Sequence, residues 1–159
     1  MAHDQHITFP AHAHDAFSHD ALERISKTIE EVEKGTSAEI RLSIRDSRET
    51  GEADLPIKEL AMKEFLHLGM EKTQHRSGIL IFILYDERKF YVCGDEGIHK
   101  RSAPETWEDV AATLKTHFRE AKFEEGVHAA LKRIKHHVRE ALPDAGAKNH
   151  ELSSEVVIS

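Results

Sequence analysis

The longest apolar run of the chain covers residues 77–85, which are almost unbroken Ile, Leu and Phe. This run is too short to cross a bilayer, and its β-branched and aromatic side chains favour a strand that is buried on both faces. A polar turn follows at residues 86–89, and residues 90–93 form a second apolar stretch. Two such stretches around a short polar turn predict a β-hairpin.

Two helices and one strand are predicted ahead of this hairpin. Apolar residues recur at steps of three and four over residues 16–34 and 55–68, which is typical of amphipathic helices. Between them, residues 38–45 alternate apolar with polar, which predicts a strand with one covered face. A strand, a helix and a second strand in this order imply a parallel pair of strands.

Two further helices are predicted after the hairpin. Ser102 and Glu105 have the spacing of a capping box, and Pro104 between them is tolerated in the first turn of a helix. A second apolar stripe predicts a last helix over residues 123–142. Residues 156–158 are apolar again and form either a short added strand or no regular structure.

The predicted elements define the fold class as α/β. We expect a mixed, mainly parallel sheet with an antiparallel hairpin and with helices packed on both faces, which is an α/β/α sandwich. At 159 residues the chain fits one domain of this kind. The domain is predicted to span residues 16–142, between a His-rich flexible arm at 1–15 and a tail at 143–159.

The composition narrows the class of function. Hydrophobic residues make up 39% of the chain and charged residues 32%, which is typical of a soluble globular protein. A formal net charge of −7 argues against general nucleic-acid binding. No segment has the length of a membrane span or the pattern of a secretory signal, so we expect a cytoplasmic protein.

Histidine is unusually frequent, with 13 copies in the chain. Five of them lie within the first nineteen residues, at His3, His6, His12, His14 and His19. Neutral imidazoles bind transition metals, so this segment could be a metal-binding arm. The alternative is a solvated terminus, which is the more frequent case and the one we favour.

The strongest candidate site follows the return strand at residues 94–97, where two glycines flank Asp95 and Glu96. Calcium takes about six to eight oxygen ligands from carboxylates, backbone carbonyls and water, and a glycine-rich loop can present them. The antiparallel return brings this loop near the start of the first strand, so Glu39 is predicted as a further ligand. His99 is close in sequence and could hold a phosphate or accept a proton. The alternative is an ordinary acidic turn beside an outward-facing Glu39.

Asp86 is a second metal candidate, at the opposite edge of the sheet. It follows the central strand, and Asp46 follows the first strand in the same way. Ligands of α/β sheets bind at the carboxyl ends of the strands, which supports a contribution of Asp86 to metal binding. Residues 86–88 also have the composition of a solvated hairpin turn, and this is the interpretation we favour.

Established phosphatase patterns are absent from the sequence. Cys93, the single cysteine, is followed by His99 where a cysteine-phosphatase loop needs arginine, so we interpret Cys93 as a buried strand residue. The chain has no Asp-x-Asp motif after a strand and no glycine-rich phosphate or dinucleotide loop. Hydrolysis of phosphate esters would need a bound cation that activates water, and the catalytic residues are unknown.

The last helix offers a function of another class. Basic residues gather on and around its outer face, namely Lys132, Arg133, Lys135, His136, His137 and Arg139. They form either a docking surface for an acidic partner or a solvated face that complements the C-terminal dipole of the helix. The solvated face is the more frequent case.

Several blocks of the sequence, taken in order, resemble the TPM domain family, which comprises the thylakoid-lumen phosphatase-like proteins and their bacterial relatives. The blocks are residues 36–40, 77–82, 86–89 and 94–98, and Trp107, Phe118 and residues 123–126 resemble the closing helices of the family. The resemblance covers roughly residues 17–142, and it implies an α/β/α sandwich, a link to calcium and a weak acid phosphatase activity. Asp95 departs from the commoner form of the glycine loop, which has an aromatic residue at this place.

The sequence therefore predicts a TPM-like protein that binds a divalent cation, calcium first, through Asp95, Glu96, Glu39 and Asp86. A weak metal-assisted phosphatase acting on phosphomonoesters is the alternative among enzymes. An interaction module on the basic face of the last helix is the alternative among non-enzymes. The predicted partners are a metal ion and a protein, with no nucleic acid and no membrane segment.

Overall fold

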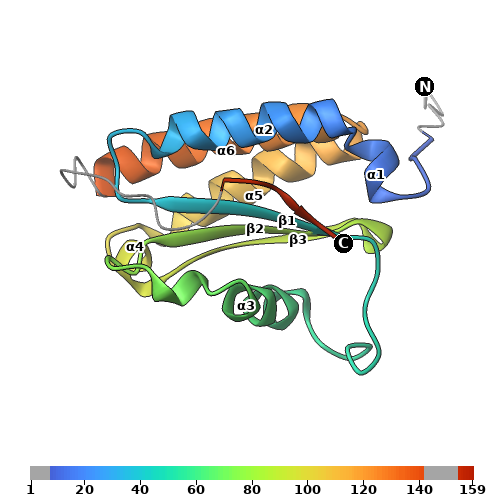
Figure 1. Cartoon of the computed structure of the whole chain (residues 1–159), viewed down its shortest axis with the longest axis horizontal. Helices are drawn as coiled ribbons and strands as arrows, with labels where there is room; N and C mark the ends of the chain where they lie inside the picture. The colour runs from blue at the N-terminus through green and yellow to red at the C-terminus, as the bar shows by residue number, and fades with distance from the viewer. Residues whose placement is uncertain (1–7, 142–153) are drawn as a thin grey trace.

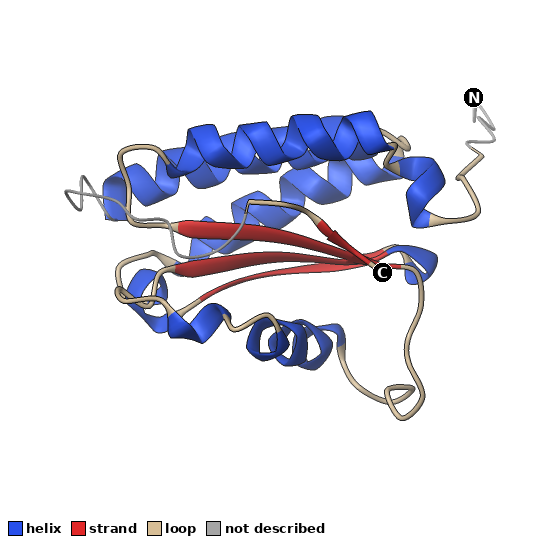
Figure 2. Ribbon diagram, viewed as in Figure 1, coloured by secondary structure: helices blue, strands red, loops and turns tan. Residues whose placement is uncertain are grey.

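A computed structural model describes residues 8–141 and 154–159 of the chain. The sheet has four strands in the order β3-β2-β1-β4, with helices on both faces (Figures 1 and 2). The strands are β1 (Glu39–Arg45), β2 (Gly78–Leu84), β3 (Lys89–Gly94) and β4 (Val157–Ile158). The α-helices are α1 (Ala13–Ala16), α2 (His19–Glu33), α3 (Ile57–His67), α4 (Glu96–His99), α5 (Pro104–Arg119) and α6 (Phe123–Ala141). Two 3₁₀ turns are η1 (Met70–Lys72) and η2 (Tyr85–Glu87).

The strand pairing confirms the mixed α/β sheet expected from the sequence. β1 pairs with β2 and β4 in parallel, and β2 pairs with β3 antiparallel across the predicted hairpin. Helices α2, α5 and α6 cover one face of the sheet, and α3 covers the other (Figure 1). The apolar end of the chain forms β4, so part of the predicted tail belongs to the sheet.

Both faces of β2 are buried, as the unbroken apolar run predicts. Ile79, Ile81 and Ile83 pack toward α2, α5 and α6. The alternate residues, Leu80, Phe82 and Leu84, pack under α3. This alternation follows from the two-residue period of a strand, and it fixes the sheet between two hydrophobic layers.

The prediction that β1 has a single covered face is wrong. Its polar side chains lie beneath α3, and Ser43 and Arg45 are both buried. Ser43 donates a hydrogen bond to Glu64 of α3, and Arg45 pairs with Glu52 at 2.6 Å. The crossover helix lies on this face, and Glu64 of α3 together with Glu52 of the preceding loop satisfies the buried side chains of Ser43 and Arg45.

The segment ahead of α2 packs on the domain from Phe9 onward. Phe9 contacts the core, the Tyr85 hydroxyl donates to the carbonyl of Pro10 at 2.6 Å, and the Ala13 N–H donates to Asp46 at 2.7 Å. The predicted boundary of the flexible arm at residue 15 therefore falls inside a packed segment. The first two histidines of that arm lie outside the described residues.

The start of α2 has a side-chain cap, and the start of α5 does not. Ser18 precedes α2, and its side chain accepts the N–H of Ala21 at 3.1 Å. The expected capping box at Ser102 is wrong, because α5 begins at Pro104 after Ala103 and has no side-chain cap. The Ser102 hydroxyl instead donates to the carbonyl of Ile98 at 2.8 Å and so closes the preceding helix.

A carboxylate accepts a backbone N–H of β1 at the part of its edge that β4 does not reach. β4 pairs only with Ser43 and Ile44, so the N–H of Ile40 lies beyond the end of this pairing. Glu33, the last residue of α2, accepts that N–H at 2.7 Å. Burial, opposed by this hydrogen bond and reinforced by the charge of Glu39, raises the pKa of Glu33 to about 8.

We predict that Glu33→Gln makes the protein more stable at alkaline pH. The pKa of Glu33 is higher in the folded state than in the unfolded chain. The contribution of protonated Glu33 to stability is therefore complete below about pH 4.5 and is lost as the pH rises through about 8. A neutral glutamine still accepts the N–H of Ile40, and the gain at pH 8 should be on the order of 2 kcal/mol or more. Urea unfolding between pH 5 and 8.5 (roughly the window of this titration) measures it.

The control for this prediction is Glu31→Gln, an exposed glutamate of the same helix. It should change stability little at any pH in this window. A difference between Glu33→Gln and wild type that does not vary with pH would contradict the elevated pKa.

Candidate functional site

The predicted acidic loop is a helix start. β3 runs through Gly94, Asp95 is the N-cap, and Glu96–His99 forms the single turn of α4. The Asp95 carboxylate accepts the N–H of Glu96 at 2.8 Å. Aspartate is among the preferred N-cap residues because its carboxylate satisfies free N–H groups of the first turn, which explains why this stretch is not an open loop.

Arg76 holds the Asp95 carboxylate from the other side. Its guanidinium makes two hydrogen bonds to Asp95, at 2.7 and 2.8 Å, and lies 3.7 Å from Glu96. The backbone of Arg76 has φ 49°, in the left-handed region that non-glycine residues rarely adopt. The Gly97 N–H donates to the Arg76 carbonyl at 2.8 Å. The two segments are thus joined through both backbone and side chain.

Glu39 lies at the same end of the sheet as Asp95. It is paired with Gly78 of β2, and Gly78 in turn accepts the N–H of Asp95 at 2.8 Å. Glu39 and Asp95 are therefore in one row but with β2 between them, so their backbones are about 10 Å apart. Glu39 is also buried, with 2% of its surface exposed.

Asp86 lies at the opposite end of the sheet. Its N–H donates to the carbonyl of Asp46 at 2.9 Å, which places both residues at the carboxyl ends of β1 and β2. The full length of β2, about 20 Å, separates Asp86 from Asp95. Because this span exceeds any coordination sphere, Asp86 cannot bind the same ion as Asp95.

The carboxylates near Asp95 already have partners. Both oxygens of Asp95 bind Arg76, and one of them also caps α4. Within residues 8–141 and 154–159, no group of three or more His, Cys, Asp or Glu side chains has an arrangement that could hold a metal ion. A cation at Asp95 would therefore have to displace Arg76 and complete its ligands with backbone carbonyls and water.

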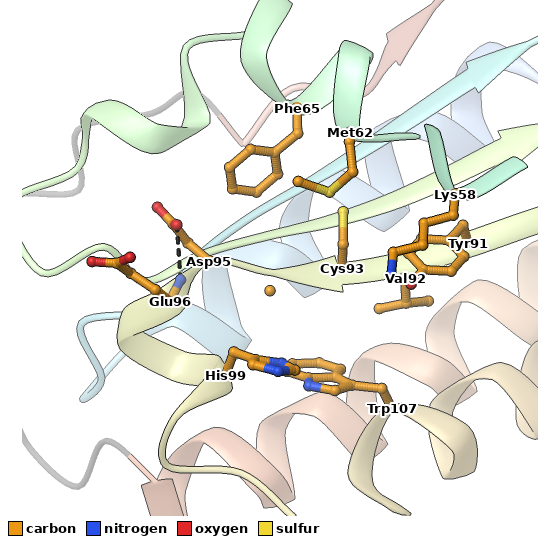
Figure 3. Close-up of a pocket in the computed structure, with 11 residues that line it drawn as sticks. Lys58, Met62, Phe65, Tyr91, Val92, Cys93, Asp95, Glu96, His99 and Trp107 are labelled. Carbon is orange, nitrogen blue, oxygen red and sulfur yellow. Dashed lines mark hydrogen bonds between the residues drawn. The ribbon is translucent and has the colours of Figure 1, made fainter. Parts of the chain in front are cut away.

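A pocket of about 340 Å³, here called the edge pocket, lies beside Asp95 (Figure 3). It is lined by Lys58, Met62, Phe65, Tyr91, Val92, Cys93, Gly94, Asp95, Glu96, His99 and Trp107. Its wall is mainly apolar, and Lys58, Glu96 and His99 bring charged or titratable groups to it. Helices α3 and α5 lie on opposite faces of the sheet, so a pocket lined by both must lie at the outer edge of β3.

Two polar groups of the edge pocket have unusual surroundings. The indole N–H of Trp107 is buried without a hydrogen-bond acceptor in the part of the chain that the structure describes. Cys93 is a buried free thiol, as predicted, and burial raises its pKa to about 12. At neutral pH the thiol stays protonated, so Cys93 is not an activated nucleophile.

Sequence reasoning missed Arg76, which belongs to a segment that looks like a plain charged connector. Its partner Asp95 lies nineteen positions later in the chain. Only the antiparallel register of β2 and β3 brings them together, and no local spacing marks this contact. The same holds for Met62, which reaches the edge pocket from α3.

The fold and the site define this protein as an α/β domain with a row of charged residues at one end of a mixed sheet. The family model of the TPM domain matches residues 12–137, which is well over half of the chain. The chain belongs to the TPM domain family.

Two solved structures share the fold. The NMR structure of the BA42 protein from the psychrophilic bacterium Bizionia argentinensis has a TM-score of 0.81 at 22% identity, over 90% of this chain and 95% of that one. The N-terminal domain of a P. gingivalis protein has a TM-score of 0.68 at 14% identity, over 86% of this chain and 85% of that one. None of the curated proteins is similar enough to count as a relative. Among the described helices, none has the length and apolar character needed to cross a membrane.

We predict that Gly97→Ala destabilises the junction between Arg76 and α4. A Cβ at this position would overlap the carbonyl oxygens of His75 and Arg76, and these are backbone atoms that cannot turn away. The expected loss of unfolding free energy is about 1–3 kcal/mol, measured by urea denaturation. Lys100→Ala, a truncation of an exposed side chain at the end of the same helical turn, is the control and should change stability by at most about 0.5 kcal/mol. Equal losses in the two variants would contradict a close backbone approach at Gly97.

Proposed function

We propose that this TPM domain binds a divalent cation, calcium first, between Asp95 and Glu96, and that Arg76 occupies this place when the ion is absent. The observation that supports the proposal is the convergence of two carboxylates on one guanidinium. Arg76 lies 2.7 Å from Asp95 and 3.7 Å from Glu96. Because the Arg76 and Glu96 side chains are 43% and 58% exposed, both can rearrange without opening the core.

The exchange of a guanidinium for calcium is chemically reasonable. Calcium accepts carboxylates, backbone carbonyls and water in flexible geometry, and this end of the sheet offers two carboxylates, one of them exposed to solvent. A bidentate arginine pair is a strong competitor, so the affinity for calcium should be low, on the order of millimolar. Glu39 would contribute through its charge, since β2 lies between it and Asp95.

The alternative of a phosphatase has less support, and it is restricted to a metal-assisted mechanism. The pKa of Cys93, raised to about 12, leaves no thiolate for a covalent mechanism at neutral pH. His99 is exposed beside the edge pocket and is available for proton transfer. Hydrolysis of phosphomonoesters would then depend on the cation bound at Asp95, and it becomes worth assaying once that binding is measured.

The interaction module on α6 is also a weaker alternative. Arg133 lies 3.7 Å from Asp109 of the neighbouring helix, and His137 lies 3.3 Å from the same carboxylate. These contacts favour a solvated face with local ion pairs over an uncompensated docking surface. The cytoplasmic location stays a prediction from the sequence.

We predict that calcium binding measured by calorimetry is weakened by Glu96→Gln and strengthened by Arg76→Gln. The first change removes a ligand charge, and the second removes the internal competitor. Asp95→Asn keeps a side chain that can cap α4 and should abolish binding. Magnesium, which demands stricter geometry and holds its waters more firmly, serves as the control ion.

Glu125→Gln in the first turn of α6 is the control variant, because it removes one exposed carboxylate from a helix that does not line the edge pocket. It should leave calcium binding unchanged. An absence of saturable heat up to millimolar calcium, which is about the affinity of the weakest protein sites, would contradict the proposal. So would a loss of binding in Arg76→Gln with the fold preserved in circular dichroism.

A further inference from the structure

The outer edge of β3 has unpaired backbone groups. β3 is the last strand of the order β3-β2-β1-β4, and no described strand lies beyond it. The Asp95 N–H bonds to Gly78 of β2, and in an antiparallel pair every second residue makes its bonds to the partner strand. Phe90, Val92 and Gly94 therefore direct their N–H and C=O groups outward, away from β2. Such a row of groups is a template for one more strand.

The edge pocket lies at the Gly94 end of this row. Met62 and Cys93 bring their sulfur atoms toward each other on one side of β3, and Trp107 lies on the other side (Figure 3). Met62 is 40% exposed, although it is a large apolar residue. The Trp107 ring forms part of the wall of this pocket, and its buried N–H lacks an acceptor among the described residues.

A second pocket of about 340 Å³, here called the cationic pocket, lies at the Phe90 end of the row. Its lining consists only of aromatic and basic side chains: Phe9, Arg88, Phe90, Lys115, Phe118 and Arg119. Within the described ranges none of the three cations forms an ion pair. In a chain with a formal net charge of −7, three uncompensated cations around one pocket favour an anionic occupant.

The ordinary structural explanations do not account for all three cations. Lys115 and Arg119 lie in the last turns of α5 and complement its dipole, but they are spaced i, i+4 and repel each other. Arg88 comes from the hairpin turn and not from the helix. It lies 4.5 Å above the Phe9 ring and donates to the Tyr85 carbonyl at 2.8 Å, so its charge is held in place beside the other two.

We propose that the outer edge of β3 binds an extended segment of a partner protein as an added antiparallel strand. An acidic side chain of this segment enters the cationic pocket, and an apolar side chain about four residues earlier enters the edge pocket. The span from Phe90 to Gly94 is about 13 Å, which sets the spacing, and an even spacing keeps both side chains on one face. A small anion would fill one pocket, whereas only a peptide backbone also satisfies the outward groups of Val92 between the two.

The charges along the edge and the preference for antiparallel pairing together set the order of residues in the added strand. The cations lie at the start of β3, and the exposed Glu96 lies just past its end. A segment whose acidic residue is C-terminal to its apolar residue meets this distribution when it runs antiparallel to β3. Antiparallel pairing is also slightly more stable per residue than parallel pairing.

The probe that tests the proposal is a fluorescein-labelled octapeptide with Leu, Val and Glu at its second, fourth and sixth positions and Thr elsewhere. Fluorescence anisotropy with the full chain should show saturable binding that weakens as salt is added. The same peptide with alternate amides N-methylated on the bonding edge should not bind, because it cannot form the ladder. A peptide with Lys in place of Glu should bind about tenfold more weakly or worse.

Two matched variants of the protein each reverse two exposed positive charges, one variant on α5 and the other on α6. Lys115→Glu combined with Arg119→Glu should lower the affinity for the octapeptide about tenfold. Lys132→Glu combined with Arg133→Glu, the same change on α6, should leave it within about twofold of wild type. Both pairs are exposed, and circular dichroism checks that each variant is folded.

Four results would overturn the proposal. The first is a lack of saturable binding up to about millimolar peptide, and the second is that the N-methylated peptide binds as tightly as the unmodified one. The third is that the variant with Lys115→Glu and Arg119→Glu binds the octapeptide as tightly as wild type. The fourth is that only the α6 variant loses binding. Sedimentation adds a fifth, since a dimer that the octapeptide does not dissociate would show that a second copy of this chain covers the edge. The N-methylated comparison uses the wild-type protein, so the test holds even if a variant fails to fold.

Discussion

The complete burial of β2 is the constraint on which the rest of the structure depends. Its seven residues are apolar on both faces, so the chain must place helices on both sides of the sheet. Neither face of β2 is then free to hold a ligand. What remains for function is the ends of the strands and the two sides of the sheet, of which the outer edge of β3 is one. Arg76 and Arg88 lie at these places, where water reaches their charges, and the buried Asp95 is paired with Arg76.

The sequence was sufficient for the features that periodicity and burial determine. It predicts β2, the hairpin and the amphipathic helices, because each depends on a local pattern of apolar residues. It predicts the family because several sequence blocks occur in the order typical of that family. It does not reveal that Ser43 and Arg45 are buried, since an alternating strand looks the same whether its polar face meets water or buried carboxylates such as those of Glu52 and Glu64. The role of Arg76 is hidden for a related reason: its partner is distant in sequence, and only strand register brings the two together.

The sequence predicted where the candidate residues lie better than it predicted which groups they contact. Asp95, Glu96 and Glu39 do lie at one end of the sheet, as the antiparallel return requires. The sequence could not show that Asp95 is already engaged as an N-cap and as the partner of a guanidinium. That engagement changes the physical question, since a cation must compete with a bidentate ion pair and not simply enter an empty loop. Affinity for the ion is then tied to the local stability of the Arg76 segment.

The two proposed binding sites are physically adjacent, and this has a consequence for how they act together. Asp95 and Glu96 line the edge pocket, so the same carboxylates would meet a cation on one side and an added strand on the other. An ion there would neutralise Glu96 and release Arg76, which changes the charge at one end of the β3 edge. Because linkage is reciprocal, any effect of calcium on peptide affinity must equal the effect of peptide on calcium affinity. If both proposals hold, the domain is a strand-binding module whose affinity responds to calcium.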